Sequence, residues 1–369
     1  MGERQHLLNG MATSAQATAL RALYALPKSA RRALAGRPTR LAGRQLDPDM
    51  QLFLKLQRLS GRNLGGGDSL AARRALEEGD AIIRGRLVEP VTVRDLRIPS
   101  PHADDPMAAR LYTPEPVAPR SGLLVFYHGG GWVVGSLESH DNVCRFLARH
   151  SGVRVLSVAY RLAPEHQFPA AADDALAAFQ HAASHADELG VDPAAIAVGG
   201  DSAGGNLAIA AALGAAEAGG VRPAYQLLFY PATDHTTFRR SRELFGEGLF
   251  LTDASMTWFA NHYVGGANPA DPRISVLLAP NLAQLPPAYL AVAGFDPLCD
   301  EGEAFAKKLA EAGVEVTFRC FDDLIHGYAN FFGFSKRARE ALGDAALALH
   351  RAVGMPRHDV LQPDAQQSL

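Results

Sequence analysis

One serine lies within a glycine cluster between two apolar runs, in the stretch IAVGGDSAGGNLAIAAAL of residues 196–213. Ser202 forms the pattern Gly-x-Ser-x-Gly with Gly200 and Gly204. The apolar run before it predicts a strand, and the alanine-rich run after it predicts a helix. On so sharp a strand-to-helix turn a serine projects its hydroxyl group, and the glycines avoid collisions with neighbouring elements. The pattern therefore predicts a serine nucleophile at residue 202.

A phosphate-binding loop is the first alternative for this glycine cluster. Gly200 and Gly205 have the spacing of a P-loop, but Asn206 and Leu207 stand where a lysine and a Ser or Thr are required. The cluster also lacks the Gly-x-Gly-x-x-Gly spacing of a dinucleotide site. The nucleotide hypotheses fail on spacing, and a tight turn without chemistry remains the alternative to a nucleophile.

A serine nucleophile needs a histidine base and an acid that orients it. In hydrolases with this turn, the acid and then the histidine follow the serine along the chain. Asp296 follows the apolar run 288–294, and His326 follows the run 315–322. Because the carboxyl ends of parallel strands meet at one edge of a sheet, both side chains are expected close to Ser202.

Each of these two residues also has an ordinary structural explanation. Asp296 precedes a proline and could simply start a turn, and His326 could be a hydrogen-bonded loop residue. Asp300, Asp322 and Asp323 could replace Asp296 as the orienting acid. The correct order of three residue types, each after its own strand, favours a catalytic triad.

A second glycine run, HGGGWVVGS, starts at His128 directly after an apolar run. Bare glycine backbone allows N–H groups to approach an oxyanion, and one such donor is typically worth about 3 kcal/mol in the transition state. We expect the donors to be Gly130 and Gly131, with Gly129 as a third candidate, together with Ala203 after the nucleophile. His128 is expected to hold the loop by hydrogen bonding.

Two other patterns resemble catalytic motifs. Ser69 lies in a Gly-Asp-Ser-Leu sequence at 67–70, but it precedes a charged helical pattern and is interpreted as a helix-capping serine. His181 and His185 have the spacing of two metal ligands on a helix, but the glutamate of the zinc motif is absent. No metal site is expected.

Eight short, mostly apolar runs from residue 88 onward predict the strands that must position these residues. They are VTVRDLRI, MAARLYT, GLLVFYH, VRVLSVAY, AIAVGG, YQLLFYPA, AYLAVAG and EVTFRCFD. Helical patterns alternate with them, the clearest being 169–184, 203–218, 300–313 and 335–353. This alternation predicts an α/β fold with a mostly parallel, eight-stranded sheet flanked by helices.

Two segments lie outside the alternation. Residues 1–87 are helical in character, and residues 235–268 are inserted between the sixth and seventh strands. Both are expected to form a helical cap over the sheet edge. The main domain is expected at 88–355, and residues 356–369 resemble a frayed tail.

The overall composition excludes several classes of protein. A net charge of −3 gives no reason to expect nucleic acid as a partner, and no apolar run is long enough to span a membrane. Three scattered cysteines do not form a disulfide framework, which favours a reducing, cytoplasmic location. The first 44 residues are basic, which suggests a helix packed over the main domain or, alternatively, one lying on a membrane surface.

With these motifs in hand, the chain resembles the bacterial hormone-sensitive-lipase family of α/β-hydrolases. The matching segments are HGGGW, VAYRLAPEHQFPAAADDA, GDSAGGNLA, DPLCDEG and HGY. The resemblance implies a carboxylesterase that prefers short to medium acyl chains, works without a cofactor and carries a helical cap. It also implies attack by Ser202, proton transfer by His326, and orientation of the imidazole by Asp296.

Further expectations concern the pocket and the assembly. Aromatic residues are candidates for the substrate pocket or the cap, with ordinary core packing as the alternative for each. They are Trp132, Phe245, Phe250, Trp258 and Phe259. A homodimer through the exposed edge of the eighth strand is also expected, from the resemblance and from the unpaired hydrogen-bonding groups of an edge strand.

Two other functions use the same scaffold. An amidase or peptidase would use the same triad but must also protonate an amine leaving group. A hydrolase-like receptor without activity typically lacks a triad member, and the sequence IHGY retains His326.

Overall fold

A sheet of eight strands forms the centre of the structure, a computed structural model that describes residues 2–61 and 64–354, with backbone alone for residues 2–12. All eight predicted strands are present. They are β3 (Val91–Ile98), β4 (Met107–Pro114), β5 (Ser121–Tyr127), β6 (Arg154–Val158), β7 (Val191–Asp201), β8 (Tyr225–Phe229), β9 (Ala288–Phe295) and β10 (Val316–Ile325). The predicted tail 356–369 lies outside the described residues.

The strand order β10-β9-β8-β7-β5-β6-β4-β3 confirms a mostly parallel sheet. Only β4 runs antiparallel to its neighbours, β3 and β6. The other pairings are parallel, so the carboxyl ends of β5, β7, β8, β9 and β10 meet at one edge. β10, the eighth predicted strand, lies at the edge of the sheet. The homodimer expected through this edge stays a prediction.

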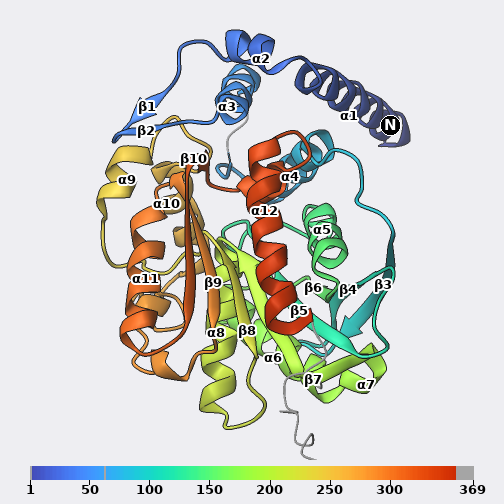
Figure 1. Cartoon of the computed structure of the whole chain (residues 1–369), viewed down its shortest axis with the longest axis vertical. Helices are drawn as coiled ribbons and strands as arrows, with labels where there is room; N and C mark the ends of the chain where they lie inside the picture. Colours follow the sequence, from blue (N-terminus) through green and yellow to red (C-terminus); the bar gives the residue numbers. More distant parts are fainter. Residues whose placement is uncertain (1, 62–63, 355–369) are drawn as a thin grey trace, which may run out of the picture.

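Helices cover both faces of the sheet, because its strands bury side chains on both sides (Figure 1). On β5, Leu123, Val125 and Tyr127 contribute to one core, whereas Leu124 and Phe126 contribute to the other. The first core includes α6 (Ala170–Ser184), α8 (Ala203–Glu217) and α11 (Cys299–Glu311). The second includes α5 (Asp141–Ser151) and α12 (Lys336–Leu349).

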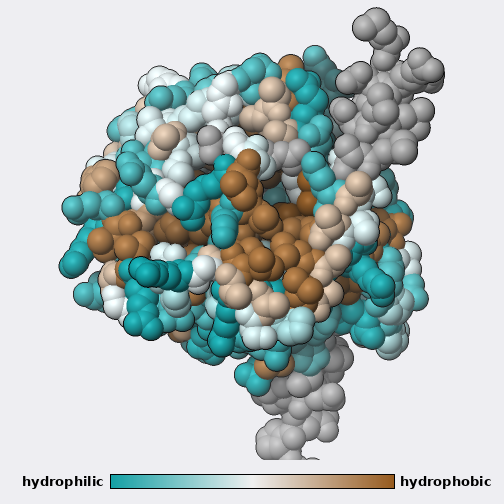
Figure 2. Space-filling view, turned by 90° about the horizontal axis from the view of Figure 1, so that it is seen from above, coloured by the Kyte–Doolittle hydropathy of each residue, from teal (hydrophilic) through white to brown (hydrophobic). Residues whose placement is uncertain are grey.

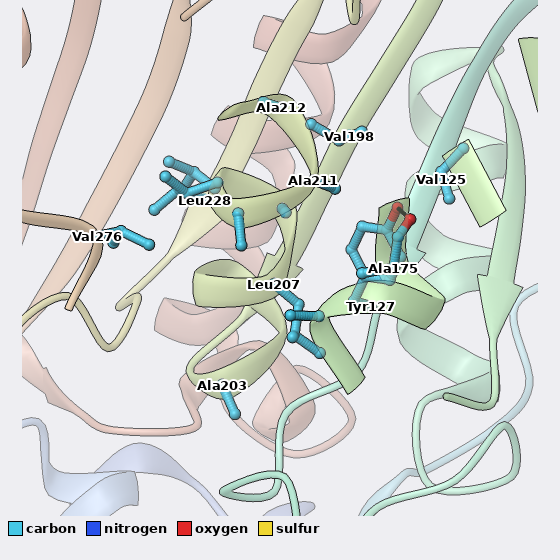
Figure 3. Packing of buried hydrophobic residues seen from close by; sticks show 14 of the residues in the cluster. Val125, Tyr127, Ala175, Val198, Ala203, Leu207, Ala211, Ala212, Leu228 and Val276 are labelled. Carbon is cyan, nitrogen blue, oxygen red and sulfur yellow. Dashed lines mark hydrogen bonds between the residues drawn. The ribbon is translucent and has the colours of Figure 1, made fainter. Parts of the chain in front are cut away.

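Helix α8 is the most deeply buried of these helices, and it carries the serine turn. Figure 3 shows Leu207 and Ala211 of α8 between the side chains of β5, β7 and β8 and those of α6. Thirteen of its fifteen residues are buried, so the small alanines and glycines allow close contact with its neighbours. This packing holds the start of α8, next to residue 202, against the sheet.

The predicted helices are present, with small shifts at their ends. The closing helix is α12, followed by a π-helical turn at His350–Gly354. The capping prediction for Ser69 is wrong by one residue: Asp68 is the N-cap of α4 (Ser69–Ile83), and its carboxylate accepts a hydrogen bond from the Ala71 N–H. Ser69 is the first helical residue, where its own side chain cannot fill the cap position.

The described residues between 2 and 87 lie over the carboxyl edge of the sheet, as helices and one short pair of strands joined by loops (Figure 1). The elements are α1 (Gly2–Tyr24), α2 (Lys28–Ala35), β1 (Arg40–Leu41), β2 (Arg44–Gln45), α3 (Pro48–Ser60) and α4. The insertion 235–268 contributes α9 (Arg240–Phe245) and α10 (Asp253–Tyr263). In the part of the chain that the structure describes, no helix combines the length and apolarity needed to cross a membrane.

The basic N-terminal segment is packed onto the main domain. The Tyr24 hydroxyl donates to the Asp49 backbone oxygen at 3.0 Å, and the Tyr24 ring lies 4.5 Å from that of Phe334. Arg44 donates to the carbonyl oxygen of Gly294 at 2.7 Å, near the end of β9. These contacts agree with the expectation of a helical segment packed over the main domain.

Candidate active site

Ser202 occupies the sharp turn between β7 and α8. Its φ of 55° and ψ of −118° lie outside the ordinary regions for a residue with a side chain. The glycines are required by contact: a Cβ atom at Gly200 or Gly204 would lie 2.3 or 1.8 Å from the Tyr127 carbonyl oxygen. The Ser202 N–H donates to the Phe229 oxygen at 2.9 Å, which ties the turn to β8.

His326 and Asp296 meet Ser202 at the carboxyl edge of the sheet. His326 Nε2 lies 2.9 Å from Ser202 Oγ, and His326 Nδ1 lies 2.7 Å from Asp296 Oδ2. Asp296 is completely buried and directly follows β9, and its Oδ1 accepts the Leu298 N–H at 2.9 Å. The structure therefore brings the three residues into one hydrogen-bonded chain, with the carboxylate held from both sides.

The three alternative acids have other partners. Asp300 accepts a hydrogen bond from the Ser241 N–H at 2.8 Å. Asp323 pairs with Arg337 at 2.9 Å, and Asp322 accepts from the Cys320 thiol at 3.0 Å. Of the four candidates, Asp296 is the one that contacts His326.

The glycine loop after β5 lies beside the serine turn. Gly130 and Gly131 have φ values of 119° and 57°, a region that favours glycine. Among the described residues, no hydrogen bond uses the N–H groups of Gly130 or Gly131, and the Ala203 N–H opens α8, where it has no acceptor within the helix. The Gly129 N–H, in contrast, donates to Asp201 Oδ1 at 2.8 Å. Gly129 is therefore not available as an oxyanion donor.

A buried ion pair that the sequence analysis missed holds this loop in place. His140 Nε2 lies 3.1 Å from Asp201 Oδ1, the same oxygen that accepts the Gly129 N–H. Burial lowers the pKa of His140 and raises that of Asp201, but their pairing outweighs burial, so the pKa of His140 is raised and that of Asp201 is lowered. The pair anchors Gly129 to the residue before the nucleophile.

His128 holds the same loop, as expected. Its Nδ1 lies 2.8 Å from the Gly129 carbonyl oxygen, and its own backbone oxygen accepts the Tyr160 hydroxyl at 2.7 Å. Burial, aided by the neighbouring His140, lowers the pKa of His128 to about 4. The side chain is neutral at physiological pH and serves the loop as a hydrogen-bonding group.

We expect Gly131→Ala to lower kcat by about 10²- to 10³-fold, the usual cost of losing one oxyanion donor. The new Cβ would lie 2.2 Å from the Phe259 ring and would move the loop. Steady-state kcat for p-nitrophenyl butanoate measures the effect. Gly266→Ala is the matched control, because nothing lies within 4 Å of a Cβ atom there. An unchanged kcat in Gly131→Ala would contradict a catalytic role for the loop.

A cavity of about 840 Å³ extends from Ser202 and His326 to the helices above. Its wall includes apolar residues of α1, α3, α4 and α10, and Figure 2 shows from above a band of hydrophobic residues between hydrophilic borders. Arg73 of α4 fastens this wall to the main domain, because its guanidinium donates to the backbone oxygens of Val133 and Ala163 and pairs with Glu165. The volume suits a small organic molecule.

Three of the five predicted pocket aromatics line this cavity, namely Trp132, Phe250 and Phe259. The other two belong to the packing around it. Phe245 is buried with its ring 5.6 Å from Phe295, and Trp258 packs edge-on against Phe259 at 5.2 Å. Helix periodicity alone does not reveal this, because Trp258 and Phe259 are adjacent and only tertiary packing decides which one faces the cavity.

Comparisons with known proteins agree with this architecture. A family model described as the alpha/beta hydrolase fold matches residues 124–330. The chain is 47% identical over 317 residues to the carboxylic ester hydrolase LipN of Mycobacterium tuberculosis, covering 83% of each chain. It is 38% identical over 307 residues to the ethyl acetate hydrolase of Pseudomonas putida, covering 80% of this chain and 96% of the other.

Solved structures are similar over the same extent. An alpha/beta hydrolase enzyme from the metagenome of Lake Arreo, Spain, has a TM-score of 0.80 at 38% identity, over 83% of this chain and 98% of that chain. A hyperthermophilic esterase from Pyrobaculum calidifontis has a TM-score of 0.77 at 37% identity, with the same coverage.

Proposed function

Since the chain belongs to the hormone-sensitive-lipase-like branch of the α/β-hydrolases and is a carboxylic ester hydrolase, we propose that Ser202, His326 and Asp296 form its catalytic triad. The observation that carries the proposal is the hydrogen-bonded chain from Ser202 Oγ to His326 at 2.9 Å and from His326 to Asp296 at 2.7 Å. Ser202, at the end of this hydrogen-bonded chain, lines the cavity.

In the proposed mechanism Ser202 Oγ attacks the ester carbonyl carbon while His326 Nε2 accepts the hydroxyl proton. Asp296 keeps the Nδ1 proton on the imidazole and stabilises the imidazolium that forms. His326 then donates its proton to the departing alcohol, which leaves an acyl group on Ser202. A water molecule, deprotonated by His326, hydrolyses that acyl-enzyme by the same route.

We assign the oxyanion hole to the N–H groups of Gly130, Gly131 and Ala203. Two of these donors lie on the glycine loop and the third opens α8, so they approach one oxygen from two elements. The pair of His140 and Asp201 supports the assignment, because it fixes the loop before any substrate binds, and preorganised donors need no reorganisation in the transition state.

The acyl group is proposed to occupy the apolar cavity beneath a cap made of residues 1–87 and 235–268. A volume of about 840 Å³ and walls of leucine, isoleucine and phenylalanine favour short- to medium-chain acyl groups. Turnover of p-nitrophenyl esters from acetate to palmitate tests this proposal. We expect kcat/KM to be highest between butanoate and octanoate and to fall at longer chains.

A matched pair of variants sharpens the chain-length test. Leu76 of α4 lines the cavity, whereas Leu70 of the same helix is half exposed outside it. Leu76→Trp fills part of the cavity and is expected to shift the optimum to shorter chains, while Leu70→Trp leaves it unchanged. Equal profiles in both variants would contradict an acyl site here. Hydrolysis of a butanoyl anilide at a rate comparable with the ester would favour the amidase alternative.

A further inference from the structure

One carboxyl group interrupts the apolar wall of the cavity. Helix α4 lines the cavity with residues at helical spacing. They are Ala72, Ala75, Leu76, Gly79, Ile82 and Ile83. Asp80 lies on the same wall, one turn after Leu76, and is only 9% exposed. The catalytic chain of Ser202, His326 and Asp296 does not use it.

The Asp80 carboxyl group has no hydrogen-bond partner among the described residues, and the Asp80 backbone oxygen accepts the Arg84 N–H at the end of α4. Burial raises the pKa of Asp80 to about 7, against the opposing effect of His140 and Arg84. A buried carboxyl group normally has partners, because leaving water without them is unfavourable. Its position on the wall of the substrate cavity suggests that the partner comes with the ligand.

A second polar side chain lies at the same end of the cavity. Asn330 lines the cavity, and its Nδ2 lies 3.5 Å from His140 Nε2, while its Oδ1 is buried without a hydrogen-bond partner in the described structure. His140 is also among the charged groups that face Asp80. This end of an otherwise apolar cavity therefore carries two polar side chains, Asp80 and Asn330.

The charged groups around Asp80 do not favour the binding of a cationic ligand. Glu138 and Asp141 also face it, but Arg110 pairs with Glu138 at 2.8 Å and Arg145 pairs with Asp141 at 2.7 Å. Of the other facing groups, His140 is paired with Asp201, and Arg84 carries a positive charge that would oppose an ammonium group. A hydroxyl group is better suited, because it donates to a carboxylate and accepts from a carboxylic acid.

We propose that Asp80 is a specificity residue, and that its side chain hydrogen-bonds a hydroxyl group carried by the ester substrate. The inference rests on the proposed function, because it assumes that the ester binds in this cavity. It assigns the substrate class as hydroxylated esters, with the ester carbonyl at Ser202 and the hydroxyl at α4.

Matched ester pairs test this proposal in the full-length enzyme. The first series compares ethyl butanoate, hexanoate and octanoate with the same esters hydroxylated on the penultimate carbon. The second compares the butanoate esters of propanol and propane-1,3-diol. The third replaces the hydroxyl group by an amine. The quantity measured is the ratio of kcat/KM for each substituted ester to that of its plain partner, in a pH-stat at constant pH.

We expect the hydroxyl preference, measured within each enzyme as the ratio to the plain ester, to fall about tenfold or more in Asp80→Leu in at least one series. Glu77→Leu removes the same charge from the exposed side of α4 and should keep the preference. Asp80→Ala replaces the leucine variant if that variant does not fold.

If the ratio of kcat/KM for hydroxylated to plain esters is equal in the wild type and the Asp80 variants, the proposal is overturned. Turnover of the plain esters by the wild type would in that case still support the proposed esterase function. If the Asp80 variants lose more of the preference for the amine esters than of the preference for the hydroxylated esters, the proposal is overturned in favour of a cationic substrate. Loss of plain-ester turnover in the wild type would instead contradict the proposed function.

Discussion

Replacing Ser202 with alanine is expected to lower kcat for p-nitrophenyl butanoate by at least about 10⁴-fold. Without Oγ the acyl-enzyme cannot form, and His326 has no hydroxyl proton to accept. Only the oxyanion donors and substrate binding would remain. Alanine keeps the Cβ atom at φ 55°, so the strain of the turn is unchanged. We expect a change in unfolding free energy of less than about 1 kcal/mol.

The control for this experiment is Ser69→Ala. Ser69 lies in the sequence Gly-Asp-Ser-Leu but forms the first turn of α4 behind the Asp68 cap, so its hydroxyl group is not expected to contribute to turnover. Burst kinetics with the wild type would show the acyl-enzyme directly. If a folded Ser202→Ala enzyme kept a substantial kcat for p-nitrophenyl butanoate, another residue would be the nucleophile.

Asp296→Asn is expected to lower kcat by about 10⁴-fold while preserving the fold. Asp296 Oδ2 accepts the Nδ1 proton of His326 at 2.7 Å, and Oδ1 accepts the Leu298 N–H at 2.9 Å. Because the backbone N–H requires an acceptor, the asparagine oxygen occupies the Oδ1 position and its NH₂ group faces His326. The imidazole then holds its proton on Nε2 and cannot accept one from Ser202.

Measured kcat for a short-chain ester, together with the thermal unfolding temperature, tests this prediction. Asp300→Asn is the matched control, since Asp300 lies shortly after Asp296, in the first turn of α11, and accepts from the Ser241 N–H. An Asp296→Asn enzyme with wild-type kcat would show that the orienting acid is elsewhere. Equal losses of kcat in the two variants would point to general disruption of the structure between β9 and α11 instead of a wrong tautomer of His326.

The sequence predicted the strands and the principal chemistry because both depend on local patterns. Continuous apolar runs of strand length identify buried parallel strands whatever their neighbours are. The glycines around Ser202 are required by contacts within a few ångström of one turn, so their spacing is visible in the chain. Asp296 and His326 directly follow β9 and β10, and parallel strands bring their carboxyl ends together at one edge.

Other features depended on contacts between distant parts of the chain. The pair of Asp201 and His140 holds Gly129 across 72 positions of sequence, and no local pattern marks a histidine as a partner for that aspartate. Arg44 reaches Gly294 across 250 positions. The sequence likewise did not determine which cap aromatics face the cavity. In the structure Phe259 contacts Gly131, whereas the adjacent Trp258 packs beside Phe259.

The sequence by itself determined the α/β architecture, the eight strands, and the serine, acid and histidine in their order. The tertiary structure decided that the Gly129 N–H donates to Asp201 and that Asp68, not Ser69, caps α4. It also placed Asp80 on the cavity wall, with no hydrogen-bond partner for its carboxyl group among the described residues. The physical reason is range: backbone periodicity and turn sterics act between near neighbours, whereas the partner of a buried polar group is set by how whole elements pack.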